Sequence, residues 1–75
     1  MTTFERRFGQ AVRRAREAKG LSQEKLGEIA KLDRTYVSGL ERATRNPTLA
    51  TLHRIAKALG VPLSELVAEA ERSSR

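Results

Sequence analysis

Four hydrogen-bonding residues lie close together in one short stretch of the chain: Arg34, Thr35, Tyr36 and Ser38. If this stretch is a helix with its apolar residues turned inward, then Arg34, Thr35 and Ser38 share the outward face. An arginine can donate two hydrogen bonds to O6 and N7 of guanine, and threonine offers a hydroxyl and a methyl that suits thymine. We therefore expect these residues to contact base edges, while Tyr36 either joins them or packs on the core.

Five further residues could contact a sugar–phosphate backbone: Gln23, Lys25, Arg42, Arg45 and Asn46. Gln23 follows a helix-start signal, where backbone N–H groups point outward and attract anions. Arg45 and Asn46 fall in an expected loop just beyond the stretch described above. Lys25 and Arg42 could serve in the same way, although a charge on a helix face is often only solvated.

Catalytic chemistry has little support in the sequence. There is no Cys and a single His, which argues against a zinc site, and no Gly-rich phosphate loop is present. Ser64 and Glu65 are better interpreted as helix-start residues than as a catalytic pair. We expect no enzyme activity, no metal, no cofactor and no small-molecule ligand.

The charge favours a polyanionic partner. The 75 residues carry a formal net charge of +6, and the sequence pI is about 10.8. Residues 1–20 contain six basic and two acidic residues, and residues 43–60 contain three basic residues and no acidic one. Only three aromatic residues occur, which fits duplex better than single-stranded nucleic acid.

No apolar run is long enough for a membrane span or a secretory signal, so we expect a cytoplasmic, bacterial nucleoid-associated protein.

Apolar periodicity and capping signals predict five helices and no sheet. Residues 4–19 form the first helix, which Gly20 ends. Ser22, Asp33 and Thr48 are expected N-caps of the second, third and fourth helices, with the third over 34–42. Gly60 ends the fourth helix, and a fifth begins at about Pro62. This is a single all-α domain over 1–75, with its core at about 4–71 and a tail at 72–75.

The second and third helices have helix-turn-helix spacing, because each spans about nine residues and a turn of about three joins them. Leu26, Val37 and Leu40 are expected to face inward. Gly27 is the small residue at the close contact between the two helices. Gly39 either lets the backbone approach a duplex or simply leaves room.

Residues 23–42 (QEKLGEIAKLDRTYVSGLER), followed by Arg45-Asn46-Pro47-Thr48, resemble the phage-repressor-like, or XRE, helix-turn-helix family. The resemblance covers residues 8 to about 67, and residues 32–42 are most similar to controller proteins of restriction–modification systems. It implies a compact five-helix DNA-binding fold, homodimers and palindromic operators. Lys31 departs from the family, which usually has Gly in the turn; a left-handed Lys31 would cost about 1–2 kcal/mol.

The same resemblance implies an ion pair between Arg16 and Glu41 that ties the first helix to the end of the third. A partly buried bidentate pair would fix the third helix against the rest of the domain. The alternative is two unrelated surface charges.

The fifth helix is the expected dimer interface, because Leu63, Leu66 and Val67 exceed what a four-helix core of this size needs. The alternative is that they cap the core. The function implied is a sequence-specific, dimeric transcription regulator of duplex DNA, and the resemblance of residues 32–42 favours the controller of a restriction–modification operon. A second hypothesis is a protein-binding module, such as the antitoxin of a toxin–antitoxin pair.

Overall fold

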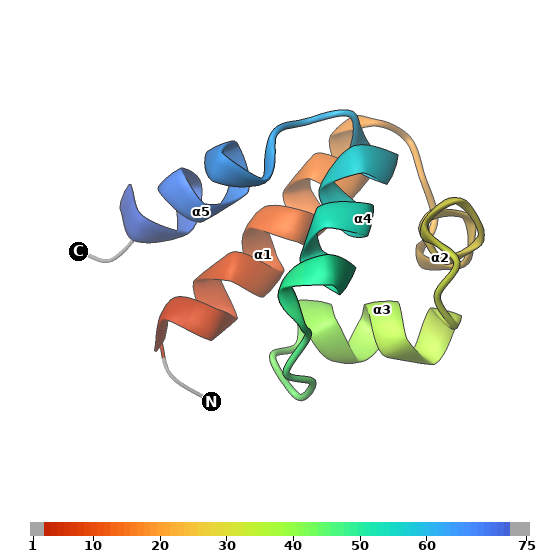
Figure 1. The fold of residues 1–75 in the computed structure, drawn as a ribbon, viewed down its shortest axis with the longest axis horizontal. Helices are drawn as coiled ribbons and strands as arrows, with labels where there is room; N and C mark the ends of the chain where they lie inside the picture. The colour runs from red at the N-terminus through yellow and green to blue at the C-terminus, as the bar shows by residue number, and fades with distance from the viewer. Residues whose placement is uncertain (1–2, 73–75) are drawn as a thin grey trace.

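The structure is a computed structural model that describes residues 3–72. These residues form five helices and no strand, which confirms the expected all-α architecture (Figure 1): α1 (Thr3–Ala18), α2 (Gln23–Ala30), α3 (Arg34–Glu41), α4 (Leu49–Leu59) and α5 (Leu63–Arg72). The third helix ends one residue earlier than expected, because Arg42 leaves the helical conformation with φ −90° and ψ 1°. The expected tail begins inside α5 at Arg72, and 73–75 lie outside the described residues.

Side-chain oxygens close the first turns of two helices. Ser22 Oγ accepts a hydrogen bond from the Lys25 amide at 2.9 Å, and Thr48 Oγ1 accepts one from the Thr51 amide at 3.1 Å. Each satisfies an N–H group that has no partner within the helix. At the other end of α4, Gly60 takes the left-handed conformation with φ 73°. The sequence-based capping predictions at Ser22, Thr48 and Gly60 are confirmed.

The start of α3 differs from the expectation in one respect. Asp33 occupies the N-cap position with extended backbone, and its carbonyl accepts from the amides of Tyr36 and Val37. Its side chain makes no capping hydrogen bond. The carboxylate is exposed, so water can solvate it in place of the helix terminus.

Two residues other than glycine have left-handed backbone, Lys31 with φ 62° and Ala43 with φ 63°. Lys31 ends α2, and the amides of Lys31 and Leu32 both donate to the Gly27 carbonyl. This is the geometry in which a helix commonly ends on glycine, so a lysine there carries conformational strain of about 1–2 kcal/mol. Ala43 plays a similar part after α3, and nothing in the sequence marked it.

All five helices contribute side chains to one core. The largest fully buried side chains are Leu26, Ile55, Leu66, Val12 and Val37. In Figure 1, α3 lies across the lower end of the molecule, below α4 and beside α2. Helix α1 packs against both α5 and α3, so it joins the end of the molecule that holds α3 to the end that holds α5.

Two glycines allow backbones to meet. A Cβ at Gly27 would collide with the Leu32 carbonyl oxygen, which gives the steric reason that the sequence suggested for this residue. A Cβ at Gly9 would lie 2.5 Å from the Glu41 carbonyl oxygen. Gly9 therefore lets α1 approach the last turn of α3, a role that the sequence analysis missed.

Within residues 3–72, no helix has the length and apolar character needed to cross a membrane. The same part of the chain contains no group of three or more His, Asp or Glu side chains arranged to hold a metal ion.

Candidate nucleic-acid interface

Helix α3 has an inner and an outer face. Val37, Leu40 and Glu41 are buried on the inner face, while Arg34 and Thr35 are exposed at the first turn. Ser38 is half-buried, one turn further along the same outer side. The structure therefore groups the three residues that were expected to contact bases on the side of α3 that faces away from the core.

The outer-face side chains of Arg34 and Thr35 are available to a ligand. Neither makes a hydrogen bond or ion pair with another side chain in the described part of the chain, and both are exposed. An arginine with this freedom keeps its full set of N–H donors for an acceptor outside the protein. The first turn of α3 therefore has donors but no internal acceptor for them.

Tyr36 is held against the loop after α3. Its half-buried ring lies 5.6 Å from the guanidinium carbon of Arg45, within range of a cation–π contact. A Cβ at Gly39 would meet Arg45 Cγ at 2.6 Å and Thr44 Oγ1 at 3.2 Å. Gly39 therefore leaves room for the protein's own loop, and this loop places Arg45 beside Tyr36.

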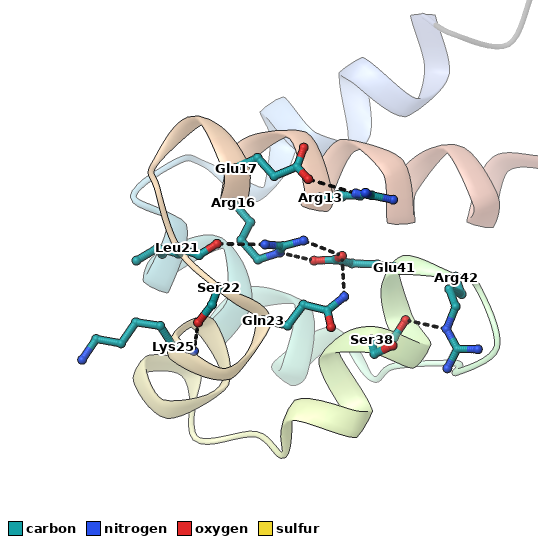
Figure 2. Close-up of polar contacts among 10 residues, drawn as sticks. All are labelled: Arg13, Arg16, Glu17, Leu21, Ser22, Gln23, Lys25, Ser38, Glu41 and Arg42. Atoms are coloured by element: carbon teal, nitrogen blue, oxygen red, sulfur yellow. Dashed lines mark hydrogen bonds and ion pairs between the residues drawn. The ribbon is translucent and has the colours of Figure 1, made fainter.

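A buried polar cluster fixes the inner face of α3 (Figure 2). Arg16 donates to Glu41 twice, from Nε to Oε2 at 2.6 Å and from Nη2 to Oε1 at 3.1 Å. Its Nη1 donates to the Leu21 carbonyl at 2.8 Å. The Arg16 and Glu41 side chains are only 10% and 3% exposed. The hydrogen bond with Glu41 raises the pKa of Arg16 above its ordinary value, so the guanidinium remains charged.

Gln23 belongs to this cluster. Its Nε2 donates to Oε1 of Glu41 at 3.0 Å, so one amide N–H that could have reached a phosphate is bound inside the protein (Figure 2). The other amide N–H and the side-chain oxygen make no hydrogen bond within the described residues. The cluster thus ties α1, the first turn of α2 and the last turn of α3 to a single carboxylate.

The remaining phosphate candidates are spread around this region. Lys25 lies on the exposed face of α2, where its Nζ is 3.5 Å from Glu28, and Arg42 makes a long contact of 3.4 Å to the Ser38 carbonyl. Arg45 and Asn46 are exposed in the loop between α3 and α4. Neither the Lys25 contact nor the Arg42 contact is short enough to immobilise the side chain.

The expected dimer residues are not all on the surface. Leu66 is 2% exposed and packs in the core of its own chain, so the expectation that it lies in a dimer interface is corrected. Burial follows from its position one turn before the buried Ala70, on the side of α5 that meets α1. Leu63 and Val67 are half-buried and remain available in part.

Another group of exposed apolar residues lies on α1, α4 and α5, whereas the sequence analysis expected such a surface on the fifth helix alone. Leu49, in the first turn of α4, is 74% exposed, and Phe4 of α1 is 41% exposed. A hollow of about 260 Å³ is lined by Phe4, Leu52 and Val67 together with the loop after α3. Leu49 and Leu52 are three residues apart on α4 and so share a face. The exposure of these side chains depends on how α1, α4 and α5 pack together. The spacing of apolar residues along each helix does not predict this packing.

Comparison with known proteins gives a family and close relatives. A family model described as helix-turn-helix matches residues 12–66. The control protein C.BamHI of Bacillus amyloliquefaciens is 49% identical over 61 residues, covering 80% of this chain and 75% of that protein. The control protein C.MunI of Mycoplasma sp is 40% identical over 73 residues, covering 96% and 99%.

Solved structures point the same way. The restriction–modification controller protein C.AhdI from Aeromonas hydrophila superimposes with a TM-score of 0.80 at 48% sequence identity. The match covers 81% of this chain and 92% of the C.AhdI chain.

Proposed function

This chain belongs to the helix-turn-helix family of DNA-binding transcription regulators, and we propose from that premise that it binds a palindromic duplex operator as a homodimer and controls a restriction–modification operon. The proposal rests on the contrast between the two faces of α3. Glu41 on the inner face is hydrogen-bonded to Arg16 of α1, whereas Arg34 and Thr35 on the outer face are exposed and have no side-chain partner within residues 3–72. The control-protein relatives support the finer assignment.

In this mechanism α3 enters the major groove with its first turn on the base edges. Arg34 donates to a guanine, Thr35 contacts a neighbouring base, and Ser38 reaches a base or a phosphate. A well-placed Arg–guanine pair contributes about 1–3 kcal/mol of discrimination between bases.

Phosphate contacts provide most of the affinity. The amides at the start of α2, together with Lys25, Arg42, Arg45 and Asn46, lie around the ends of the helix-turn-helix and neutralise or bind the backbone. Affinity then falls steeply as salt rises, because bound counterions are released on association. Tyr36 supports this role indirectly by holding Arg45 in the loop.

A homodimer would place two copies of α3 about 34 Å apart, one turn of B-DNA. The apolar surface formed by Phe4, Leu49, Leu52 and Val67 is the best candidate for its interface, because Leu49 and Phe4 are exposed and Phe4, Leu52 and Val67 line one hollow. Val67 is one of the residues that the sequence analysis assigned to this contact.

Selection of bound sequences from a random duplex library tests base readout. The wild-type protein should enrich a two-fold symmetric site, and Arg34→Ala should lose preference at one position in each half-site. Arg42→Ala is the matched control, since loss of a phosphate contact weakens all sequences alike. If Arg34→Ala enriched the same site as the wild type, Arg34 would have no part in readout.

Sedimentation equilibrium tests the dimer. The wild-type protein should sediment at twice the chain mass at micromolar concentration, and Leu49→Ser should shift it towards the monomer. A wild-type protein that stays monomeric, and becomes stable only with a different polypeptide, would support the antitoxin-like alternative.

The operon assignment has its own test. The genes on either side of the coding sequence should include a restriction endonuclease and its methyltransferase, and the selected operator should lie upstream of one of them. If neither gene is present, the protein is a regulator of the same family that serves a different operon.

A further inference from the structure

A second hollow lies on a different side of the molecule, between the end of α2 and the outer face of α4. Its volume is about 290 Å³. We name it the α2–α4 hollow and define it by its lining residues: Ile29, Ala30, Lys31, Arg54, Lys57 and Ala58. The lining contains three cations, three apolar residues and no carboxylate. The hollow therefore combines basic and apolar groups.

The three cations of the α2–α4 hollow have no counter-charge. Lys31, Arg54 and Lys57 are exposed, and none of their side chains forms an ion pair or hydrogen bond within residues 3–72. By contrast, Arg13, Arg14 and Lys25 elsewhere on the surface each lie within ion-pair distance of a glutamate. The positive charge at the hollow is thus uncompensated inside the chain.

Ile29 supplies the apolar part of the site. It is 47% exposed, although it lies on a helix whose other large apolar residue, Leu26, is completely buried. Leaving an isoleucine half in water forgoes part of the roughly 1.5–3 kcal/mol that its burial would contribute. A ligand that covered Ile29 would recover some of this free energy.

Lys31 provides an independent observation. Its left-handed backbone, with φ 62° and ψ 49°, is a conformation that glycine adopts without strain. The exposed lysine side chain forms no hydrogen bond or ion pair within residues 3–72 that would offset this strain. A glycine would end α2 in the same way without strain, so the helix terminus does not require the positive charge that Lys31 adds to the hollow.

The α2–α4 hollow shares no lining residue with the proposed DNA-binding and dimer surfaces. Helix α4 begins beside the loop after α3 and runs away from it, so Lys57 lies towards the end distant from α3 (Figure 1). None of the residues of the α2–α4 hollow belongs to the outer face of α3 or to the Phe4–Leu49–Val67 surface.

We propose that the α2–α4 hollow docks an acidic, amphipathic segment of another protein while the regulator is bound to DNA. One apolar side chain of that segment covers Ile29, and its carboxylates pair with Lys31, Arg54 and Lys57. A protein segment fits better than a phosphate backbone because half of the lining residues are apolar, and phosphates offer no group that benefits from covering the exposed Ile29. This interaction is additional to operator binding and does not depend on the identity of the operon.

A synthetic helical peptide rich in Glu with a single face of Leu can probe this site in an NMR titration of isotope-labelled full-length protein. The protein is first saturated with duplex DNA, which occupies the other basic surface. The largest amide shifts should fall at residues 29–31 and 54–58. The double substitution Arg54→Glu/Lys57→Glu should weaken peptide binding by at least about tenfold, which corresponds to 1.4 kcal/mol.

The matched control is Arg6→Glu/Arg72→Glu, which makes the same change in net charge at exposed positions outside the hollow. This control should bind the peptide within about twofold of the wild type. Ile29→Ser should weaken binding of the Leu-containing peptide but not of a peptide in which Ser replaces Leu. Circular dichroism of each variant verifies that it remains helical.

Several results would overturn the proposal. Peptide shifts confined to α3, or displacement of the peptide by duplex DNA, would identify a non-specific polyanion at the DNA-binding surface. Equal weakening by the two charge-reversal pairs would show that only net charge matters. The absence of binding at millimolar peptide would remove the site. The titration is repeated without DNA, so the peptide result does not require DNA binding and its failure is distinct from failure of the proposed function.

Discussion

Two arginines lie on opposite faces of α3: Arg16, which comes from α1, contacts the inner face, and Arg34 belongs to the outer face. Arg16 reaches the inner side of α3, is 10% exposed, and makes three hydrogen bonds to Glu41 and Leu21. Arg34, on the outer side, is exposed and has no partner within residues 3–72. In a buried environment a charge must be paired, whereas in water it is stable alone. The inner arginine is therefore committed to the fold, and the outer one is free for a ligand.

The buried cluster explains how so short a domain can hold α3 in a fixed orientation. A chain of this size has only a few kcal/mol of net stability, so it cannot fix every exposed side chain. The carboxylate of Glu41 instead holds three backbone segments at one point through Arg16 and Gln23 (Figure 2). The buried hydrogen bonds of Glu41 set the orientation of α3, and within residues 3–72 the side chains of its outer face stay free of contacts that would fix their conformation.

Breaking the inner side should have the largest effect. Glu41→Ala leaves Arg16 buried without its partner, and we expect a loss of about 3–5 kcal/mol in the free energy of unfolding, enough to unfold much of the protein. Urea denaturation followed by circular dichroism measures the change. Glu17→Ala is the control, because its pair with Arg13 is exposed and contributes less than about 1 kcal/mol. Equal effects of the two substitutions would contradict the distinction drawn here.

The packing around the inner side can be tested without changing a charge. Gly9→Ala would place a methyl 2.5 Å from the Glu41 carbonyl, and backbone cannot yield easily. We expect a loss of about 2–3 kcal/mol from overpacking, measured in the same denaturation experiment. Gln10→Ala, on the exposed side of the same turn, should change stability by less than about 0.5 kcal/mol. If Gly9→Ala left the free energy of unfolding unchanged, α1 and α3 would be able to move apart at little cost.

A substitution on the outer face of α3 should change DNA binding and leave the free energy of unfolding unchanged. Arg34→Ala should reduce discrimination between operator and non-operator duplex by about 1–3 kcal/mol, or roughly fivefold to 150-fold. Its unfolding midpoint should match that of the wild type, because the side chain has no partner to lose. Fluorescence anisotropy with both duplexes, alongside denaturation, separates the two quantities. A destabilised Arg34→Ala with unchanged discrimination would reverse the assignment.

The smallest expected effect is a gain. Lys31→Gly removes the strain of a left-handed lysine, and we expect about 0.5–1 kcal/mol of added stability after the greater chain entropy of glycine is subtracted. Thermal unfolding detects this as an increase in Tm. Ala43→Gly relieves a similar backbone angle but also deletes a buried methyl, so it should gain less or lose stability.

Much of the fold could be predicted because its signals are local. Helix positions follow from apolar spacing at three and four residues, and the capping residues Ser22, Thr48 and Gly60 act within one turn of themselves. Even the outward placement of Arg34 and Thr35 follows once Val37 and Leu40 face inward. The ion-pair partners Arg16 and Glu41 came from family resemblance, since they are 25 residues apart and no period connects them.

What could not be predicted required knowledge of how helices meet. Leu66 and Val67 are adjacent apolar residues, and only the packing of α5 on α1 buries the first in the core while leaving the second partly exposed. The same holds for Gln23, whose amide meets Glu41 because the first turn of α2 lies beside the last turn of α3.

Five helices, a helix-turn-helix and a net positive charge could be predicted from the amino-acid sequence, because periodicity, capping and charge are properties of neighbouring residues or of composition. The packing of the helices was needed to find that Glu41 is shared by Arg16 and Gln23, that Leu49 is exposed, and that three cations line one hollow with Ile29. These features depend on distances between segments remote in the chain. Such distances are set by how the side chains of several helices fill one core together.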